Sequence, residues 1–446
     1  MEFERRLFVE QLKNWKLSPH RKPLIVRGAR QVGKTYIVKK FAATHFKRTH
    51  YVNFEQNKRA RELFAEDLAP KRILRDISFL LDTPIDPAND LVIFDEVQLA
   101  PQGITSLKYF YEDLPQCAIC AAGSLIGLNL AGDSFPVGKV DMLTLYPMTF
   151  EEFLEALGNK LLLEYIHEHP TKRIISEAAH KKLFDYLTQY FVCGGMPAVV
   201  KMFAEYQDDL YQATKVVREQ QLVLIDTYLS DFAKHCGKAN ALHIERVFRA
   251  VPSQMAGSPD SKAPRFQFKD VVPGISQYAP LASALDWLGR AGLILRVPIL
   301  DKPIPPLAPR VKESRFKLYL HDVGLLGALA DVKVEGILKF NFSNFKGYFA
   351  ENFVAQELMA CNARSLYCWK EGGAEVEFVL DRGSYGLPIE VKSGNFKQAK
   401  SLRVYLERYN PKEAIMLTGY AAATTPIAGV KVYPLYLAGR FAGYPP

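Results

Sequence analysis

The sequence predicts an α/β protein with a parallel sheet in its first part and several domains in all. Two observations carry this prediction. A chain of 446 residues is longer than one ordinary hydrophobic core supports. Its first 150 residues contain three apolar, strand-like runs, and the first run leads through a glycine-bounded loop into a helix.

The composition is typical of a globular protein, since 48% of the residues are apolar and 24% are charged. No run approaches the roughly 18 apolar residues of a membrane span, so we expect a cytoplasmic protein with no membrane partner. The closest cysteines, Cys117 and Cys120, lie in an apolar run, which indicates buried small side chains. The net charge of +9 is compatible with contact to nucleic acid, but a surplus of this size is more often an ordinary solvated surface.

The strongest motif lies in "KPLIVRGARQVGKTYIVKKFA", where an apolar strand, a loop and a helix follow one another. The loop fits G-x-x-x-x-G-K-[ST], the pattern of a phosphate-binding P-loop. Glycines let backbone N–H groups surround phosphate oxygens, the lysine reaches the β- and γ-phosphates, and the hydroxyl binds Mg²⁺. The sequence therefore predicts that ATP binds along the loop and the first helical turn, at Gly28, Ala29, Arg30, Gln31, Val32, Gly33, Lys34, Thr35 and Tyr36.

Two further apolar strands end in polar residues that suit the same site. "DLVIFDEVQLA" contains Asp95, predicted to hold Mg²⁺ together with Thr35, and Glu96, predicted to orient or deprotonate the attacking water. "CAICAAGSLIG" reaches Ser124, which is either a sensor of the γ-phosphate or a turn residue after a buried strand. Lys34, Glu96 and Ser124 are thus the candidate catalytic residues of an ATPase.

"LPIEVKSG", near the end of the chain, has Glu390 and Lys392 two positions apart on a predicted strand, so both side chains share one face. The preceding "AEVEFVLDRGSYG" is predicted to form a hairpin with it. Antiparallel pairing brings Glu377 beside this pair, and Glu351 lies on an earlier helix. The four side chains form either a buried ion network or a metal-dependent phosphodiesterase site in which Glu377 and Glu390 hold Mg²⁺.

Together, these segments resemble the AAA-type ATPases that carry a C-terminal domain of unknown function 4143. The resemblance extends over nearly the whole chain. It is carried by "RGARQVGKT", "YVNFE", "LVIFDEVQ", "AAGSLIGL", "LYPMTFEEFL", "CGGMPAVV", "LYLHDVGLLGAL", "GYFAENFVAQEL" and "PIEVKSG".

This resemblance, with the order of helices and strands, implies four parts. They are a P-loop AAA-type core at 1–150, a helical lid at 151–240, a winged-helix-like domain at 241–330 and a restriction-endonuclease-like α/β domain at 331–446. The winged helix is predicted either to dock on DNA or to pack against its neighbours.

Three local features accompany this division. Thr149 and Glu152 suit a capping box at the start of the lid. Gly194 and Gly195 are expected in a packed turn between two helices. The family's Gly-Arg pair is replaced by Gly138 and Lys139, which keeps the charge but loses the planar guanidinium.

The leading hypothesis is an ATP- and Mg²⁺-binding ATPase that couples its nucleotide state to the winged-helix and nuclease-like parts. One alternative is an ATP-regulated, metal-dependent nuclease that acts on double-stranded DNA. Another is an ATP-switched module whose inactive tail binds a protein partner. The sequence leaves the oligomeric state open.

Overall fold

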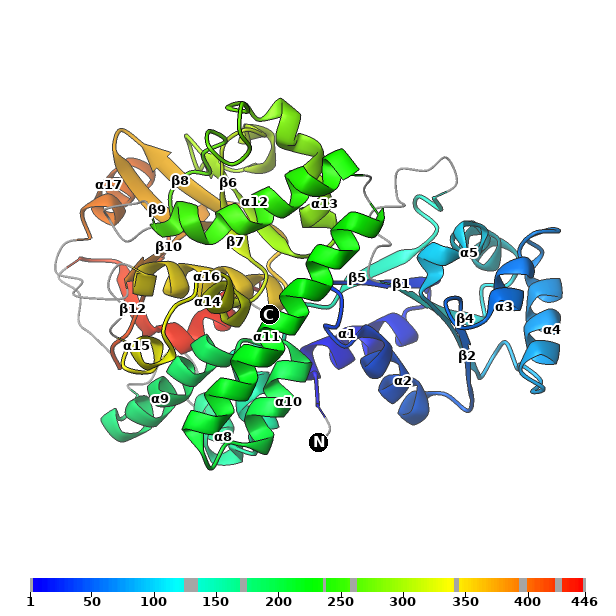
Figure 1. Cartoon of the computed structure of the whole chain (residues 1–446). Coiled ribbons are helices and arrows are strands. Elements are labelled where there is room, and N and C mark those ends of the chain that lie inside the picture. The colour runs from blue at the N-terminus through cyan, green and yellow to red at the C-terminus, as the bar shows by residue number, and fades with distance from the viewer. Residues whose placement is uncertain are drawn as a thin grey trace. The chain divides into compact units, whose positions relative to one another are not determined.

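The computed structural model describes residues 3–123, 135–168, 175–235, 238–256, 263–340, 345–392, 399–421 and 427–443. The chain divides into two compact units (Figure 1). The N-terminal unit contains Glu4–Tyr146 and Arg290–Gly292. The C-terminal unit contains Met1–Phe3, Pro147–Gly289 and Leu293–Pro446. The predicted α/β class is confirmed.

The N-terminal unit is built on a parallel sheet with the strand order β2-β3-β4-β1-β5. All five strands run in the same direction, so their carboxyl ends meet at one edge. The strand β4 separates β1 from β3, and the pairing aligns Asn53 with Asp95 and Asp95 with Ala122. The strands are β1 (Leu24–Arg27), β2 (Thr49–Asn53), β3 (Leu91–Asp95), β4 (Ala118–Ala122) and β5 (Asp141–Thr144).

Helices cover both faces of this sheet (Figure 1). Side chains of α3, α4 and α5 form one core with alternate residues of the central strands, and Phe54, Phe64 and Phe94 pack edge-to-face within it. The helices α1 and α2 lie on the other side. The helices are α1 (Arg6–Leu17), α2 (Lys34–His45), α3 (Lys58–Glu62), α4 (Pro70–Leu80), η1 (Val97–Leu99) and α5 (Pro101–Asp113).

The C-terminal unit contains a mixed sheet with the order β12-β11-β10-β9-β8-β6-β7. The predicted hairpin is confirmed, because β9 and β10 pair antiparallel. The helix α17 covers one face through Leu402 and Tyr405, which pack with Trp369. The strands are β6 (Ile294–Leu300), β7 (Phe316–Leu320), β8 (Tyr367–Glu371), β9 (Ala374–Asp381), β10 (Gly386–Lys392), β11 (Ala414–Thr418) and β12 (Val430–Pro434).

Along the chain, the helices of the C-terminal unit come before, between and after the strands of this sheet. The capping box predicted at Thr149 and Glu152 is confirmed. The helices are α7 (Phe150–Ala156), α8 (Lys160–Glu168), α9 (Glu177–Cys193), α10 (Pro197–Glu205), α11 (Leu210–His235), α12 (Lys238–Ala256), η2 (Ala279–Leu281), α13 (Ala282–Arg290), η3 (Ala308–Arg310), α14 (Val323–Leu329), α15 (Val334–Leu338), α16 (Phe345–Ala360), α17 (Lys400–Tyr409) and η4 (Leu435–Phe441).

The strands β6 and β7 were predicted as parts of a separate winged helix. They pair antiparallel with each other, and β6 also pairs in parallel with β8. They therefore extend the sheet formed by the last part of the chain. The fourfold division at 150, 240 and 330 stays a prediction.

Asp322 joins two segments that lie far apart in the sequence. Its fully buried carboxylate accepts the N–H of Gly195 at 2.6 Å and, as the cap of α14, the N–H of Leu325 at 3.0 Å. Burial raises its pKa to about 6, while these N–H donors act in the opposite direction. A side chain at Gly194 would meet the same carboxylate, because an added Cβ would lie 2.1 Å from Asp322 Oδ1. The packed turn predicted at the two glycines is therefore confirmed.

Met148 connects this turn to the start of α7. Its N–H donates to Gly195 O at 2.7 Å, and its carbonyl accepts the hydroxyl of Tyr190. Tyr190 in turn accepts Gln356 Nε2 at 2.7 Å, and Gln356 Oε1 accepts the N–H of Val323 at 2.9 Å. One buried hydrogen-bond network thus links α7, the α9–α10 turn, α14 and α16.

None of the helices in the described part of the chain combines the length and apolar character that crossing a membrane requires.

Gly195→Ala is expected to lower the stability of the folded chain by about 1–3 kcal/mol, the usual cost of overpacking a core. An added Cβ would lie 2.1 Å from Met148 O and 2.7 Å from Met148 N, and these backbone atoms cannot rotate away. The midpoint of urea unfolding measures the effect. Gly289→Ala is the matched control, because that exposed helical glycine has no heavy atom within 4 Å of an added Cβ. Equal unfolding midpoints for the two variants would contradict this account.

Candidate nucleotide-binding site

The predicted strand, loop and helix form β1, residues 28–33 and α2. Gly33 precedes α2 with φ 97° and Gly28 has φ 149°, backbone conformations that side chains rarely adopt. Gly28 also lacks room, since an added Cβ would lie 2.2 Å from Leu145 O. Arg5 is buried and donates to Val32 O at 3.3 Å and to Tyr146 O at 2.6 Å. The loop is therefore held in place by the packing of its backbone against Leu145 and by the side chain of Arg5.

Lys34 is buried at the start of α2, and its ammonium group lies inside the loop. Its Nζ donates to Gly28 O at 2.9 Å and to Ala29 O at 2.8 Å. Burial lowers the pKa of Lys34 to about 8, although the nearby carboxylates of Glu96 and Asp95 act to raise it. The ammonium is thus poised where phosphate oxygens can replace two backbone carbonyls as its acceptors.

Thr35 and Asp95 bring hard oxygen ligands together beside the loop. The Thr35 hydroxyl donates to the carboxylate of Asp95, with distances of 3.0 Å to Oδ2 and 3.2 Å to Oδ1. A hydroxyl next to a carboxylate is a donor set that Mg²⁺ accepts. Glu96 follows with φ 52°, an uncommon conformation for a residue with a side chain, and accepts Gln98 Nε2. These residues fit a Mg²⁺–nucleotide complex.

The other predicted loop residues occupy different environments. Ala29 and Val32 are buried, Arg30 is half-buried, and Gln31 and Tyr36 are exposed. Ser124 lies outside the described residues, so its two interpretations both stay open. It follows shortly after β4, whose carboxyl end lies between those of β1 and β3.

Tyr51 also reaches Asp95, and the sequence analysis missed it as a site residue. Its hydroxyl donates to Asp95 Oδ2 at 2.6 Å and accepts Asn53 Nδ2 at 3.0 Å. Burial and the hydrogen bond to Asp95 raise the pKa of Tyr51 to about 12. The signal was present in "YVNFE", where two polar residues alternate on a strand that pairs with the acidic one.

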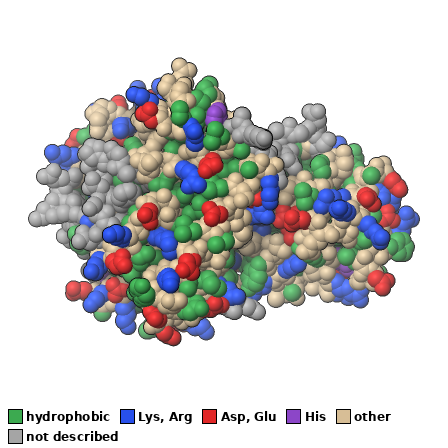
Figure 2. Space-filling view, in the orientation of Figure 1, with side chains coloured by type: hydrophobic (Ala, Val, Ile, Leu, Met, Phe, Trp, Pro, Cys, Tyr) green, Lys and Arg blue, Asp and Glu red, His purple; other side chains and the backbone are tan. Residues whose placement is uncertain are grey.

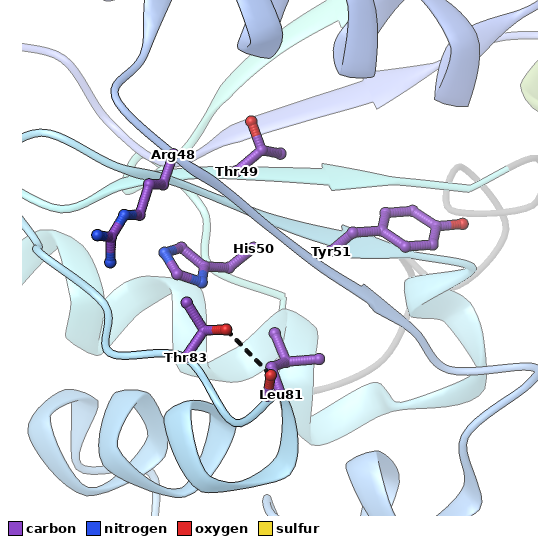
Figure 3. A pocket seen from close by; sticks show the side chains of 6 residues that line it. All are labelled: Arg48, Thr49, His50, Tyr51, Leu81 and Thr83. Atoms are coloured by element: carbon purple, nitrogen blue, oxygen red, sulfur yellow. Dashed lines mark hydrogen bonds between the residues drawn. The ribbon is translucent and has the colours of Figure 1, made fainter.

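A cavity of about 400 Å³ borders β2, an edge strand of the sheet. Figure 3 shows that the Tyr51 side chain extends away from His50 and Thr83. His50, on the same strand, is buried, and its Nε2 lies 2.8 Å from Oδ2 of the buried Asp90. The cavity is lined by Arg48, Thr49, His50, Tyr51, Leu81 and Thr83.

Lys139, which replaces the family's arginine, has partners within the N-terminal unit. Its Nζ lies 3.2 Å from Glu112 Oε1 and 5.3 Å from the centre of the Tyr111 ring. A role of Lys139 toward a second subunit stays a prediction.

The C-terminal unit brings three of the four predicted acidic-site residues together. Lys392 Nζ lies 2.6 Å from Oε1 of Glu390, which is buried. On the neighbouring strand, Glu377 is fully buried and its Oε2 accepts the N–H of Val391 at 3.0 Å. The period-two alternation and the antiparallel register therefore position these groups as the sequence indicated.

Glu351, the fourth predicted residue, belongs to an ion network that the sequence analysis did not foresee. Its Oε2 accepts the hydroxyl of Tyr319 at 2.8 Å and lies 3.3 Å from Nζ of Lys317, which is fully buried. Lys317 Nζ also lies 2.6 Å from Glu375 Oε1. Burial alone would lower the pKa of Lys317, but these two carboxylates hold it well above its usual range. Lys317 and Tyr319 alternate on β7, and only the pairing of distant segments could reveal their partners.

Across the described ranges, His, Cys, Asp and Glu side chains form no group of three or more that could hold a metal ion. Cys117 and Cys120 are buried, as predicted. On the face shown in Figure 2, basic and acidic side chains are interspersed, and neither sign covers a large continuous area. The use of Glu351, Glu377, Glu390 and Lys392 in a nuclease, and contact with DNA, stay predictions.

Comparison with protein families identifies three segments. Residues 20–154 match an AAA domain, residues 184–336 match a domain of unknown function (DUF8612), and residues 346–437 match a domain of unknown function (DUF4143). No curated protein matches the chain.

Several solved structures match at low identity. A Walker-type ATPase of Pyrococcus abyssi is 17% identical, with a TM-score of 0.46 over 74% of this chain and 96% of that chain. The Orc1 protein of Aeropyrum pernix in complex with DNA is 11% identical, with a TM-score of 0.31 over 74% and 91%. Cdc6p from Pyrobaculum aerophilum is 13% identical, with a TM-score of 0.28 over 76% and 94%.

The affinity for ATP is expected to fall as the pH rises above about 8, the pKa of Lys34 in the free protein. Bound phosphates favour the ammonium form, so binding above this pH must take up a proton and weakens by up to about tenfold per pH unit. Titrations of ATP between pH 7 and 9.5 measure the slope. Lys34→Arg is the control, because a guanidinium stays charged and its slope should be flat. The same slope in both proteins would contradict the assignment.

Proposed function

From an AAA domain followed by a DUF4143 domain, we propose that this protein binds Mg²⁺–ATP, hydrolyses it and transmits the nucleotide state to its C-terminal unit. The observation that carries the proposal is the convergence of Lys34, Thr35, Asp95 and Glu96 at the carboxyl edge of one parallel sheet. This arrangement suits phosphoryl transfer, in which positioning and charge stabilisation supply most of the catalysis.

Each residue has a distinct role in this proposal. Lys34 exchanges the carbonyls of the loop for oxygens of the β- and γ-phosphates, and the loop N–H groups bind the remaining oxygens. Thr35 and Asp95 hold Mg²⁺, which neutralises charge on the phosphates. Glu96 orients the attacking water and accepts its proton, and the contact with Gln98 restrains its carboxylate.

The transmission rests on the short segment from Leu145 to Thr149, which covalently joins the two units. At its start, the N–H of Leu145 donates to Arg27 O at 2.8 Å, and its carbonyl faces Gly28. At its end, Met148 uses both backbone groups within the network that contains Gly195 and Asp322. A change at the loop therefore has a continuous backbone path to the α9–α10 turn and α14, which supports coupling.

The nuclease and partner-binding alternatives are not adopted. Glu390 and Lys392 contact each other, but this contact suits a structural ion pair as well as a phosphodiesterase site. Glu351 is engaged by Lys317 and Tyr319. Lys317 also pairs with Glu375, whose other oxygen lies 2.7 Å from Lys370 Nζ, so two lysines accompany the two carboxylates. The partner on which the C-terminal unit acts stays undefined in this proposal.

Glu96→Gln is expected to keep ATP affinity near the wild-type value and to reduce turnover by about 100-fold or more, because the amide cannot accept a proton. Phosphate release and an ATP titration measure the two quantities on the same preparation. Lys34→Ala is expected to abolish ATP binding, since the loop loses the ammonium group that lies inside it. Wild-type turnover in Glu96→Gln would refute the assignment of the base.

Mg²⁺–ATP is expected to slow amide hydrogen exchange at 193–200 and 322–329 in the wild-type chain, because the network around Asp322 tightens when nucleotide occupies the loop. Hydrogen exchange followed by mass spectrometry measures this protection. Lys34→Ala should show no nucleotide effect. Protection that stays unchanged in the wild type while ATP binds would refute the coupling and leave the ATPase proposal intact.

A further inference from the structure

The carboxylate of Asp95 has a donor that does not come from the P-loop or from the acidic strand. Tyr51 lies on β2, and its hydroxyl reaches Asp95 Oδ2 at 2.6 Å. The other contacts of this carboxylate come from Thr35 and from the N–H of Glu96, which donates to Oδ1 at 3.1 Å. Donors from three different segments therefore fix one carboxylate.

The Tyr51 ring is itself held by α2. Lys39 Nζ lies 3.1 Å from the ring centre, a cation–π contact. Lys39 follows Thr35 by four residues, so the two side chains occupy the same face of α2. The helix thus contacts the carboxylate through Thr35 and the tyrosine through Lys39.

Asn53 completes the arrangement on β2. Its Nδ2 donates to the Tyr51 hydroxyl at 3.0 Å, which directs the phenol hydrogen toward Asp95. Its Oδ1 accepts the N–H groups of Glu55 and Gln56 at 2.8 and 2.9 Å, so the amide orientation is fixed by the turn after the strand. Tyr51 and Asn53 share one face of β2 because strand side chains alternate.

We propose that Tyr51 is a positioning residue of the ATPase site, whose hydroxyl holds the Asp95 carboxylate in the orientation needed to bind Mg²⁺ with the nucleotide. This inference rests on the proposed function. A carboxylate that must join a metal with near-ideal octahedral geometry cannot rotate freely without a loss of affinity. Hydrogen bonds to metal ligands commonly supply about 10- to 100-fold in metal affinity or activity. Tyr51 donates to Oδ2 of Asp95, whereas the N–H of Glu96 donates to the other oxygen, Oδ1.

Tyr51→Phe tests this role, because it removes one oxygen and leaves the ring beneath Lys39. The affinity for Mn²⁺ in the presence of a non-hydrolysable ATP analogue is expected to fall about tenfold, as measured by electron paramagnetic resonance. The affinity for the analogue without metal should stay within about twofold of the wild-type value. The Mg²⁺ concentration for half-maximal turnover should rise about tenfold, with kcat restored at saturating Mg²⁺.

Tyr109→Phe is the matched control, since that half-buried tyrosine lies on α5 and contacts Lys108 rather than the carboxylate. It should leave all three quantities unchanged, and thermal unfolding should be alike for both variants. Unchanged Mn²⁺ affinity in Tyr51→Phe would overturn the proposal. A parallel loss of metal-free analogue binding would also overturn it, because it would indicate a general structural effect. The wild type could bind Mn²⁺ and the analogue without hydrolysing ATP. In that case the proposed ATPase activity is refuted, but the Mn²⁺ titration of Tyr51→Phe still tests the role of Tyr51.

Discussion

The backbone of residues 145–149 is a constraint within each unit, because its first residue packs in the N-terminal unit and Met148 packs in the C-terminal unit. Its first residue hydrogen-bonds the end of β1, and its carbonyl lies so close to Gly28 that no side chain fits there. Three residues later, both backbone groups of Met148 are hydrogen-bonded within the C-terminal unit, and Gly195 again has no room for a methyl group. Closely packed backbone of this kind shifts between discrete arrangements when it moves and does not deform gradually.

The side chains of the candidate nucleotide site hold one another in place. Lys34 lies in the loop, Thr35 donates to Asp95, and Tyr51 donates to the same carboxylate. In the proposed function, phosphate oxygens of ATP replace the carbonyl partners of Lys34. The free energy of ATP binding therefore includes the cost of removing Lys34 from two buried carbonyls as well as the gain from its contacts with phosphate.

Burial decides the behaviour of the acidic groups in the C-terminal unit. Lys317 and Glu351 are almost completely buried, so the attraction between their charges must offset the loss of hydration. Removing one partner from such a network is strongly destabilising, because it leaves a buried charge alone. Here the arrangement joins α16, β7 and β9, which are widely separated in the sequence.

The sequence by itself determined the local elements. It predicted the loop between β1 and α2, the acidic end of β3, the capping box at Thr149 and the hairpin at 374–392, because each depends on spacing within a few residues. Only the tertiary structure decided that β6 pairs with β8, that Glu351 meets Lys317, and that Tyr51 reaches Asp95. These contacts depend on which distant strands become neighbours, and periodicity within one segment carries no information about its partner in space.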